Sequence, residues 1–238
     1  MWTEIRGLRE DIDYGTPPRD GEPVSLTVDG VSVTVPEGSS VMLAAAEAGC
    51  PIPKLCATDT LESFGSCRVC LVEVEGQRGY PASCTTVVAP DMVVTTQSER
   101  LTELRRNVME LYLSDFPESE IPDGWSEFHE TLEAIGLKGH RYGDGQNHFD
   151  LRVDDSNPYF LFDPAKCIVC SRCVRACEEI QGTFALTIQA RGFESKVAAS
   201  QDEPFMESEC VSCGACVQAC PSHALVEKSL FPGGYERA

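Results

Sequence analysis

Residues 167–179 read CIVCSRCVRACEE, and residues 210–222, CVSCGACVQACPS, repeat the same cysteine spacing. Each segment places four cysteines within eleven residues. Cysteines at this density occur in zinc sites, in disulfide frameworks and around iron–sulfur clusters. The spacing of the cysteines and their total number in the chain distinguish these three kinds of site.

The cysteine count argues against disulfides. The chain has 13 cysteines, an odd number, and its N-terminus, MWTEIRGLREDIDYG, lacks the apolar core of a secretory signal. We therefore expect a cytoplasmic protein with reduced thiols. The cysteines form two groups, which indicates two separate regions of metal chemistry: Cys50, Cys56, Cys67, Cys70 and Cys84, and then Cys167, Cys170, Cys173, Cys177, Cys210, Cys213, Cys216 and Cys220.

The late group has the C-x₂-C-x₂-C-x₃-C spacing of bacterial ferredoxins with two [4Fe–4S] clusters. In that arrangement the fourth cysteine of each run binds the other cluster. The sequence therefore predicts two ligand sets. The first [4Fe–4S] cluster is assigned to Cys167, Cys170, Cys173 and Cys220, and the second to Cys177, Cys210, Cys213 and Cys216. Zinc is the alternative, but zinc sites usually use cysteine pairs separated by a longer spacer.

The early group reads Cys56-x₁₀-Cys67-x₂-Cys70-x₁₃-Cys84. Plant-type [2Fe–2S] ferredoxins use C-x₄-C-x₂-C and a distant fourth cysteine, so the first interval is longer here and the last is short. Gly65 precedes the paired cysteines and permits a close approach of the backbone to sulfur. We predict one [2Fe–2S] cluster on Cys56, Cys67, Cys70 and Cys84, and a structural role for the remaining Cys50.

No other motif predicts substrate chemistry. The four histidines, His129, His140, His148 and His223, are scattered, and no nucleotide-binding glycine motif is present. The formal net charge of −19 opposes nucleic-acid binding and favours a basic protein partner. No run of residues is long and apolar enough to predict a membrane span. We expect electron transfer without catalytic residues in this chain.

Hydrophobic patterning predicts a small α+β unit around the early cysteines. VSLTVDGVSVTV (residues 24–35) predicts a hairpin that turns at Asp29-Gly30. SSVMLAAAEAG (39–49) predicts a helix capped by Ser39 or Ser40 and ended by Gly49. CLVEVEG (70–76) and DMVVTT (91–96) predict further strands.

Farther along the chain the pattern changes to a helix and then to loops. A capping box from Thr96 to Glu99 predicts a helix to about residue 113. Its expected apolar face consists of Leu101, Leu104, Val108, Leu111 and Tyr112. A loop-like stretch with a short helix near 125–135 follows, and residues 183–200 predict two strands around Arg191-Gly192.

Five stretches carry a family resemblance: AGCPIPKLC, FGSCRVCLVEV, LRRNVMELYLSD, DPAKCIVCSRCVRACEEIQGTFALT and ESECVSCGACVQACPSHAL. The chain resembles the N-terminal iron–sulfur region of the large subunit of cytoplasmic NAD-dependent molybdenum or tungsten formate dehydrogenases. It is also similar to the large iron–sulfur subunit of respiratory complex I and to the small diaphorase subunit of NAD-reducing hydrogenases.

The resemblance implies an α+β fold in four parts. Residues 1–22 are expected to form an N-terminal arm and 23–98 a [2Fe–2S] ferredoxin-like (β-grasp) domain. Residues 99–156 are expected to form a helix and loop linker, and 157–238 a bacterial two-[4Fe–4S] ferredoxin domain. Family members carry an additional cluster on one histidine and three cysteines in the linker region, where this chain has no cysteine. We therefore expect that cluster to be missing.

The function implied is that of an electron-transfer subunit in a hetero-oligomeric formate dehydrogenase complex. Such a subunit would relay electrons between a molybdopterin or tungstopterin catalytic subunit and a flavin/NAD-binding subunit. Two alternatives are a relay in an NAD-reducing hydrogenase and a redox-sensing or structural iron–sulfur module. The metal in the partner's active site would distinguish the formate dehydrogenase from the hydrogenase. Reduction of the clusters by a partner would distinguish both of these relays from a redox-sensing or structural module.

Overall fold

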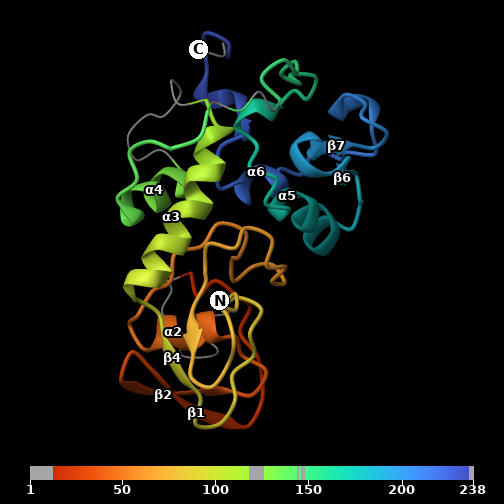
Figure 1. Ribbon diagram of the computed structural model, residues 1–238. Coiled ribbons are helices and arrows are strands. Elements are labelled where there is room, and N and C mark those ends of the chain that lie inside the picture. The colour runs from red at the N-terminus through yellow and green to blue at the C-terminus, as the bar shows by residue number, and fades with distance from the viewer. Residues whose placement is uncertain (1–12, 118–125, 144, 146–147, 236–238) are drawn as a thin grey trace. The chain divides into compact units, whose positions relative to one another are not determined.

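The computed structural model describes residues 13–117, 126–143, 145 and 148–235. The chain divides between Arg105 and Arg106 into two compact units (Figure 1). The long helix α3, Glu99–Ser114, begins in the first unit and ends in the second. None of the helices in the described ranges is long and apolar enough to cross a membrane.

The first unit is built on a four-stranded sheet with strand order β2-β1-β4-β3. Strands β1 (Pro23–Val28) and β2 (Val31–Pro36) form the predicted antiparallel hairpin. Asp29 and Gly30 both have positive φ, 47° and 82°, as a two-residue hairpin turn requires. Strand β4 (Val93–Thr95) runs parallel to β1, and β3 (Glu73–Val74) pairs antiparallel with β4.

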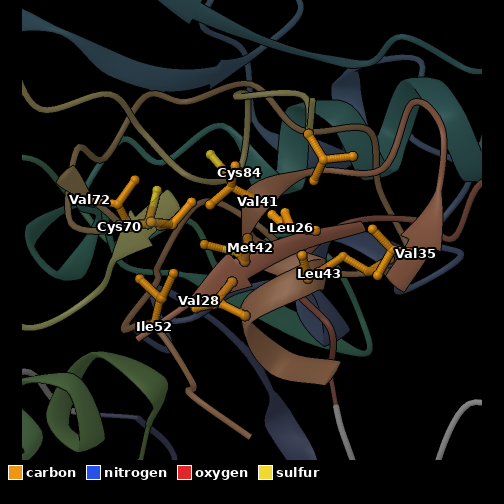
Figure 2. Packing of buried hydrophobic residues seen from close by; sticks show 14 of the residues in the cluster. Leu26, Val28, Val35, Val41, Met42, Leu43, Ile52, Cys70, Val72 and Cys84 are labelled. Atoms are coloured by element: carbon orange, nitrogen blue, oxygen red, sulfur yellow. The ribbon is translucent and has the colours of Figure 1, made fainter. Parts of the chain in front are cut away.

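Helix α2 (Val41–Glu47) packs its apolar side against this sheet. Ser40 caps its first turn by accepting a hydrogen bond from the Leu43 N–H at 3.0 Å, and Gly49 follows the helix with φ 74°. Figure 2 shows side chains from α2 and the strands gathered in one core with two of the early cysteines. The packing therefore joins the sheet, the helix and the cysteine loop.

Part of the predicted N-terminal arm lies against the first unit. Tyr14 is buried in its core, and the Thr16 hydroxyl lies 2.7 Å from that of Ser40. Lys54 forms an ion pair with Asp13 at 2.6 Å. Residues 1–12 of the predicted arm lie outside the described residues.

Helix α3 differs from the prediction in its cap and its buried face. The Leu101 N–H donates to Ser98 Oγ at 3.1 Å, while the side chain of Thr96 binds Asp29 instead. The predicted capping residue is therefore wrong by two positions. The buried face carries Leu101, Arg105, Met109 and Leu113, whereas Leu111, which was predicted for it, is exposed.

The second unit contains two small sheets and several short helices. Strands β5 (Phe160–Phe162) and β8 (Leu225–Glu227) pair antiparallel, as do β6 (Leu186–Gln189) and β7 (Lys196–Ala199). The latter pair is the predicted hairpin around Arg191-Gly192. The other elements are α4 (Glu127–Ile135), α5 (Arg172–Arg175), a π-helix (Ala176–Gln181), α6 (Ala215–Gln218) and 3₁₀ turns at Pro164–Lys166, Gly192–Glu194, Phe205–Glu207 and Lys228–Leu230.

The core of the second unit surrounds the late cysteines. Cys173, Cys177 and Cys216 are buried among apolar side chains that include Phe160 and Phe205. Those two rings pack edge to face with centroids 5.2 Å apart. Most of the first late run thus lies inside this unit, whereas Cys213 of the second run is exposed.

Candidate metal centres

The loop after α2 brings four early cysteines together. Cys56, Cys67, Cys70 and Cys84 are each 2% exposed or less. Hydrogen bonds from the Cys67 and Cys84 thiols lower the pKa of Cys56, and donation to Cys56 and Cys70 raises the pKa of Cys84. A backbone hydrogen bond also links Cys70 to the segment that carries Cys84, because the N–H of Ser83, the residue before Cys84, donates to the Cys70 carbonyl at 2.9 Å. The four predicted ligands therefore form one buried group.

Gly65 has a backbone conformation that favours glycine. Its φ is 76°, and a Cβ at this position would lie 3.1 Å from the Thr85 methyl group. A side chain here would be strained and crowded. Arg68, between the paired cysteines, also has positive φ, 58°, so the loop turns tightly around the sulfurs.

Cys50 does not belong to this group. It lies at the end of α2, and its thiol faces the Ala48 carbonyl, with the two atoms 3.8 Å apart. Burial raises its pKa, as does the neighbouring Asp29 carboxylate. Its side chain packs against the first core, which fits the predicted structural role.

The two late runs share a backbone conformation as well as a spacing. The second residue after the first cysteine has positive φ in both: 51° at Val169 and 56° at Ser212. The residue after the second cysteine does too: 67° at Ser171 and 78° at Gly214. Three of these four residues are not glycine, and each such conformation costs about 1–2 kcal/mol. Both loops are thus held in the same strained path around their sulfurs.

The fourth cysteine of each run lies beside the other run. Burial raises the pKa of Cys167 to about 12, and the Cys220 thiol adds to the increase. Burial also raises the pKa of Cys170, and there Cys220 is the next contribution. In the second run, burial raises the pKa of Cys216 to about 12, and Cys177 is among the neighbouring thiols that contribute. The structure thus places Cys220 near Cys167 and Cys170, and Cys177 near Cys216; the two sets of four ligands stay a prediction.

Hydrogen-bond donors point at several of these sulfurs. The Ser212 N–H donates to Cys210 Sγ and the Leu225 N–H to Cys220 Sγ, each at 3.4 Å. The Thr183 hydroxyl lies 3.2 Å from Cys177 Sγ. Such contacts favour the anionic sulfur of a metal-bound thiolate.

The donor set fits iron–sulfur clusters. Each group supplies four thiols, and eight of the twelve are buried, where an isolated thiolate is disfavoured. Bound iron would provide the positive charge that such a site needs. Within the described ranges, no three histidine, cysteine, aspartate or glutamate side chains are arranged to hold a single metal ion.

Three buried cations accompany the first late run, and the cysteine spacing gave no sign of them. Lys166, Arg172 and Arg175 are 6%, 3% and 7% exposed. Arg172 Nη1 donates to Glu127 Oε2 at 2.7 Å, and Lys166 Nζ lies 5.0 Å from the centre of the Tyr235 ring. A comparison of the two runs, residue by residue, would have revealed this difference in charge.

The histidines are held by local contacts. His129 is buried in α4, with Nδ1 2.6 Å from Ser126 Oγ and its ring edge-on to Phe116 and Phe128. His148 Nε2 lies 2.5 Å from the Ser195 carbonyl oxygen. The contact of His148 agrees with the prediction of a locally satisfied histidine, whereas His129 is satisfied at Nδ1 and its buried Nε2 has no hydrogen-bond partner among the described residues.

Comparison with known families identifies both regions. A model of the 2Fe-2S iron–sulfur cluster binding domain matches residues 21–99, and one of the 4Fe-4S dicluster domain matches residues 166–224. The chain therefore has an N-terminal [2Fe–2S] domain and a C-terminal two-[4Fe–4S] domain in a mixed α and β fold. Its cofactors are one [2Fe–2S] cluster and two [4Fe–4S] clusters, so the predicted fold class and cofactors are confirmed.

Relatives of the chain occur in several NAD(P)-linked oxidoreductases. An NADH-quinone oxidoreductase subunit of Mycobacterium bovis is 40% identical over 200 residues, which cover 82% of this chain and 24% of the relative. The NADP-reducing hydrogenase subunit HndD of Solidesulfovibrio fructosivorans is 37% identical over 213 residues, 86% of this chain and 36% of the relative. A putative formate dehydrogenase of Staphylococcus haemolyticus is 28% identical over 213 residues, which cover 88% of this chain and 21% of the relative.

A solved structure covers most of the chain. A chain from an NAD⁺-reducing [NiFe]-hydrogenase in the H₂-reduced state superposes with a TM-score of 0.76 at 29% identity, covering 90% of each chain. The curated relatives are much longer, since this chain spans only 21–36% of their lengths.

Proposed function

We propose that this chain relays electrons one at a time through three iron–sulfur clusters within an NAD(P)-linked oxidoreductase complex. The observation that carries the proposal is the sequence spacing of 12 of the 13 cysteines, which divides them into three sets of four. In this assignment no cysteine of a set is left to act as a nucleophile. The chain would conduct electrons and leave substrate chemistry to another subunit.

The ligand assignment is part of the proposal. Cys56, Cys67, Cys70 and Cys84 hold the [2Fe–2S] cluster. The first [4Fe–4S] cluster is held by Cys167, Cys170, Cys173 and Cys220, and the second by Cys177, Cys210, Cys213 and Cys216. The crosswise approach of Cys220 and Cys177 to the opposite runs supports it.

The clusters supply reversible one-electron reduction, and the chain supplies their environment. Backbone N–H groups such as those of Ser212 and Leu225 donate to sulfur, which stabilises the more negative, reduced state. Apolar neighbours such as Phe160 and Phe205 exclude water from the centre of the dicluster unit. Solvent access and these contacts are the means by which a protein sets a cluster's potential.

The finer proposal is that the complex is a cytoplasmic formate dehydrogenase. The chain would then form a hetero-oligomer with a molybdopterin or tungstopterin catalytic subunit and a flavin/NAD-binding subunit. The family resemblance of the cysteine stretches supports this assignment, as does the similarity to a putative formate dehydrogenase. The domain division at residues 22, 98 and 156 belongs to the same proposal, in which the third part lacks the family's histidine/cysteine cluster. Electrons would pass directly between the [2Fe–2S] and the first [4Fe–4S] cluster, or the [2Fe–2S] cluster would be a side branch.

A second candidate is a relay in an NAD-reducing hydrogenase. The observation that favours it is the superposition with the [NiFe]-hydrogenase chain, which covers 90% of both molecules. Both candidates use the same electron-transfer chemistry and differ in the catalytic partner.

Purification of the chain with its native partners tests the proposal. We expect molybdenum or tungsten in the complex and formate-dependent reduction of NAD. Nickel with hydrogen-dependent NAD reduction would replace the formate assignment by the hydrogenase. Clusters that no partner reduces or reoxidises would refute the relay itself and favour a redox-sensing or structural module.

A further inference from the structure

The two late cysteine runs have the same spacing and the same backbone turns but different charges. Aligned on their cysteines, the first run has cations where the second has none: Lys166, Arg172 and Arg175 correspond to Glu209, Ala215 and Gln218. The stretch 201–220, which contains the second run, has four acidic residues and no lysine or arginine. The internal repeat therefore preserves the ligands and changes the electrostatics.

The cations of the first run are buried, which makes the difference significant. Burying a charged group is costly unless an opposite charge or a hydrogen bond compensates it. Arg172 is paired with Glu127, but its side chain is 4% exposed, whereas that of Glu127 is 41% exposed. Water screens the carboxylate much more than the guanidinium. The pair therefore leaves a net positive potential on its buried side.

Arg172 lies directly beside proposed ligands of the first cluster. It precedes Cys173 in the chain and follows Cys170 by two residues, and both cysteines are 7% exposed. Its charge is therefore buried next to the sulfurs that would carry the negative charge of the cluster. Its charge is permanent at physiological pH, so the effect does not depend on titration of the arginine.

Lys166 adds a second buried positive charge, directly before Cys167 in the chain. Burial lowers the pKa of His129 and of His223, and the Lys166 charge lowers both further. Glu127 acts on His223 with the opposite sign, and buried Asp163, three residues before Lys166, accepts from the Tyr235 hydroxyl at its Oδ2, 2.6 Å away.

The second run has access to water instead. Cys213 is exposed, and so is Val211 two residues earlier. Solvent stabilises added negative charge much as a fixed cation does.

We propose that the buried guanidinium of Arg172, assisted by Lys166, stabilises the reduced state of the first [4Fe–4S] cluster, and that water does so for the second. Reduction adds one electron to a cluster with four thiolates, with no bond formed or broken. Burial alone would make this addition unfavourable and lower the potential. Arg172 offsets that effect, so that an electron can pass between a buried and a solvated cluster. The proposal rests on the ligand sets given above.

Arg172→Gln in the full chain, purified anaerobically in the complex it forms, tests this proposal. In a redox titration followed by low-temperature EPR, the midpoint potential of the first cluster should fall by about 59 mV, equivalent to a tenfold change in a one-electron equilibrium. The second cluster in the same molecule should keep its potential. Arg172→Lys, which retains the charge, should shift the first cluster less. Arg191→Gln removes an exposed arginine from the same unit and should shift neither cluster.

The titration also has clear negative outcomes. An unchanged first potential in Arg172→Gln, or equal shifts of both clusters, would overturn the proposal. If Arg172→Gln fails to assemble its cluster, Ala215→Arg decides: a higher potential of the second cluster supports the proposal, and an unchanged one overturns it. Cys220→Ser and Cys177→Ser identify which signal belongs to which cluster. Potentials are measured without formate or hydrogen, so failure of the proposed function would be seen separately in the activity assays.

Discussion

Arg105 joins helix α3 to the cysteine loop of the first unit, and its replacement should destabilise the [2Fe–2S] site. Arg105 is 6% exposed, and its Nη2 donates to the Leu71 carbonyl at 2.6 Å and to the Thr96 carbonyl at 2.8 Å. Leu71 directly follows Cys70, one of the proposed cluster ligands. The Arg105 side chain therefore links two segments, the loop that carries Cys70 and the end of the strand before α3.

The structure gives the magnitude of the effect. Arg105→Leu keeps an aliphatic stem but removes two charge-assisted hydrogen bonds, each of which contributes about 1.5–3 kcal/mol. Two buried carbonyls also lose their donor. Allowing for relaxation and entry of water, we expect a loss of about 3 kcal/mol in local stability, the lower end of that sum. If the cluster is lost through opening of this loop, the rate should increase by about two orders of magnitude.

The assay is the loss of the [2Fe–2S] visible circular dichroism signal in excess iron chelator. Arg106→Leu is the matched control, because Arg106 is the next residue, its side chain is 56% exposed, and its 3.6 Å ion pair with Glu110 is longer than the 2.6 Å pair that Glu110 forms with Arg141. The buried Glu110 carboxylate therefore keeps its closer partner, and this variant should release iron nearly as slowly as the original chain. Equal rates for the two leucine variants would refute the argument.

Four further predictions concern the ligands, the thiol outside the sets, a helix cap and pH. Cys177→Ser should remove the second [4Fe–4S] cluster, with a loss of about 4 of about 10 irons per chain; disappearance of the first cluster's EPR signal instead would contradict the ligand exchange. Cys50→Ser should retain the full [2Fe–2S] signal, and a diminished signal would make Cys50 a ligand. Ser40→Ala should cost about 1 kcal/mol, measured as a lower unfolding midpoint of the first unit, because α2 loses its cap; an unchanged midpoint would count against the cap. Burial, with the charges of His223 and Lys166, lowers the pKa of His129, so the unfolded chain binds this proton more readily. The free energy of unfolding should therefore fall as pH decreases below about 6.5. Chemical denaturation at two pH values should show a smaller pH dependence of this free energy in His129→Phe. An equal pH dependence in the variant and the original chain would mean that His129 has the same pKa in the folded and unfolded states.

The sequence predicted those features that short-range chemistry determines. Asp29-Gly30 between alternating residues indicated the hairpin, because few other dipeptides adopt two successive positive φ values. The cysteine spacing indicated the two [4Fe–4S] clusters, because short loops can reach only particular positions around a cluster. In both cases the information lies within a dozen residues.

Features that depend on distant partners could not be predicted. Thr96 looked like a helix cap, but Asp29, 67 residues earlier, accepts hydrogen bonds from its backbone N–H and its hydroxyl. Arg105 occupies the buried face of α3 because carbonyls from elsewhere in the unit need its donors. Periodicity assigns an arginine to the surface, so the predicted face was rotated and wrongly included Leu111.

The buried arginines also show that an iron–sulfur motif predicts the positions of the ligands but not the charges around them. Spacing and backbone turns at Val169 and Ser212 recur because sulfur positions around a cubane leave little freedom. The charge beside the motif is free to differ, since Arg172 and Ala215 occupy equivalent positions in loops of the same path. Ligand spacing thus determines which cluster can form, while the residues between the ligands adjust how readily it accepts an electron. An electron relay therefore requires both the ligand spacing and suitable charges beside it, and the effect of those charges can be judged only when their burial is known.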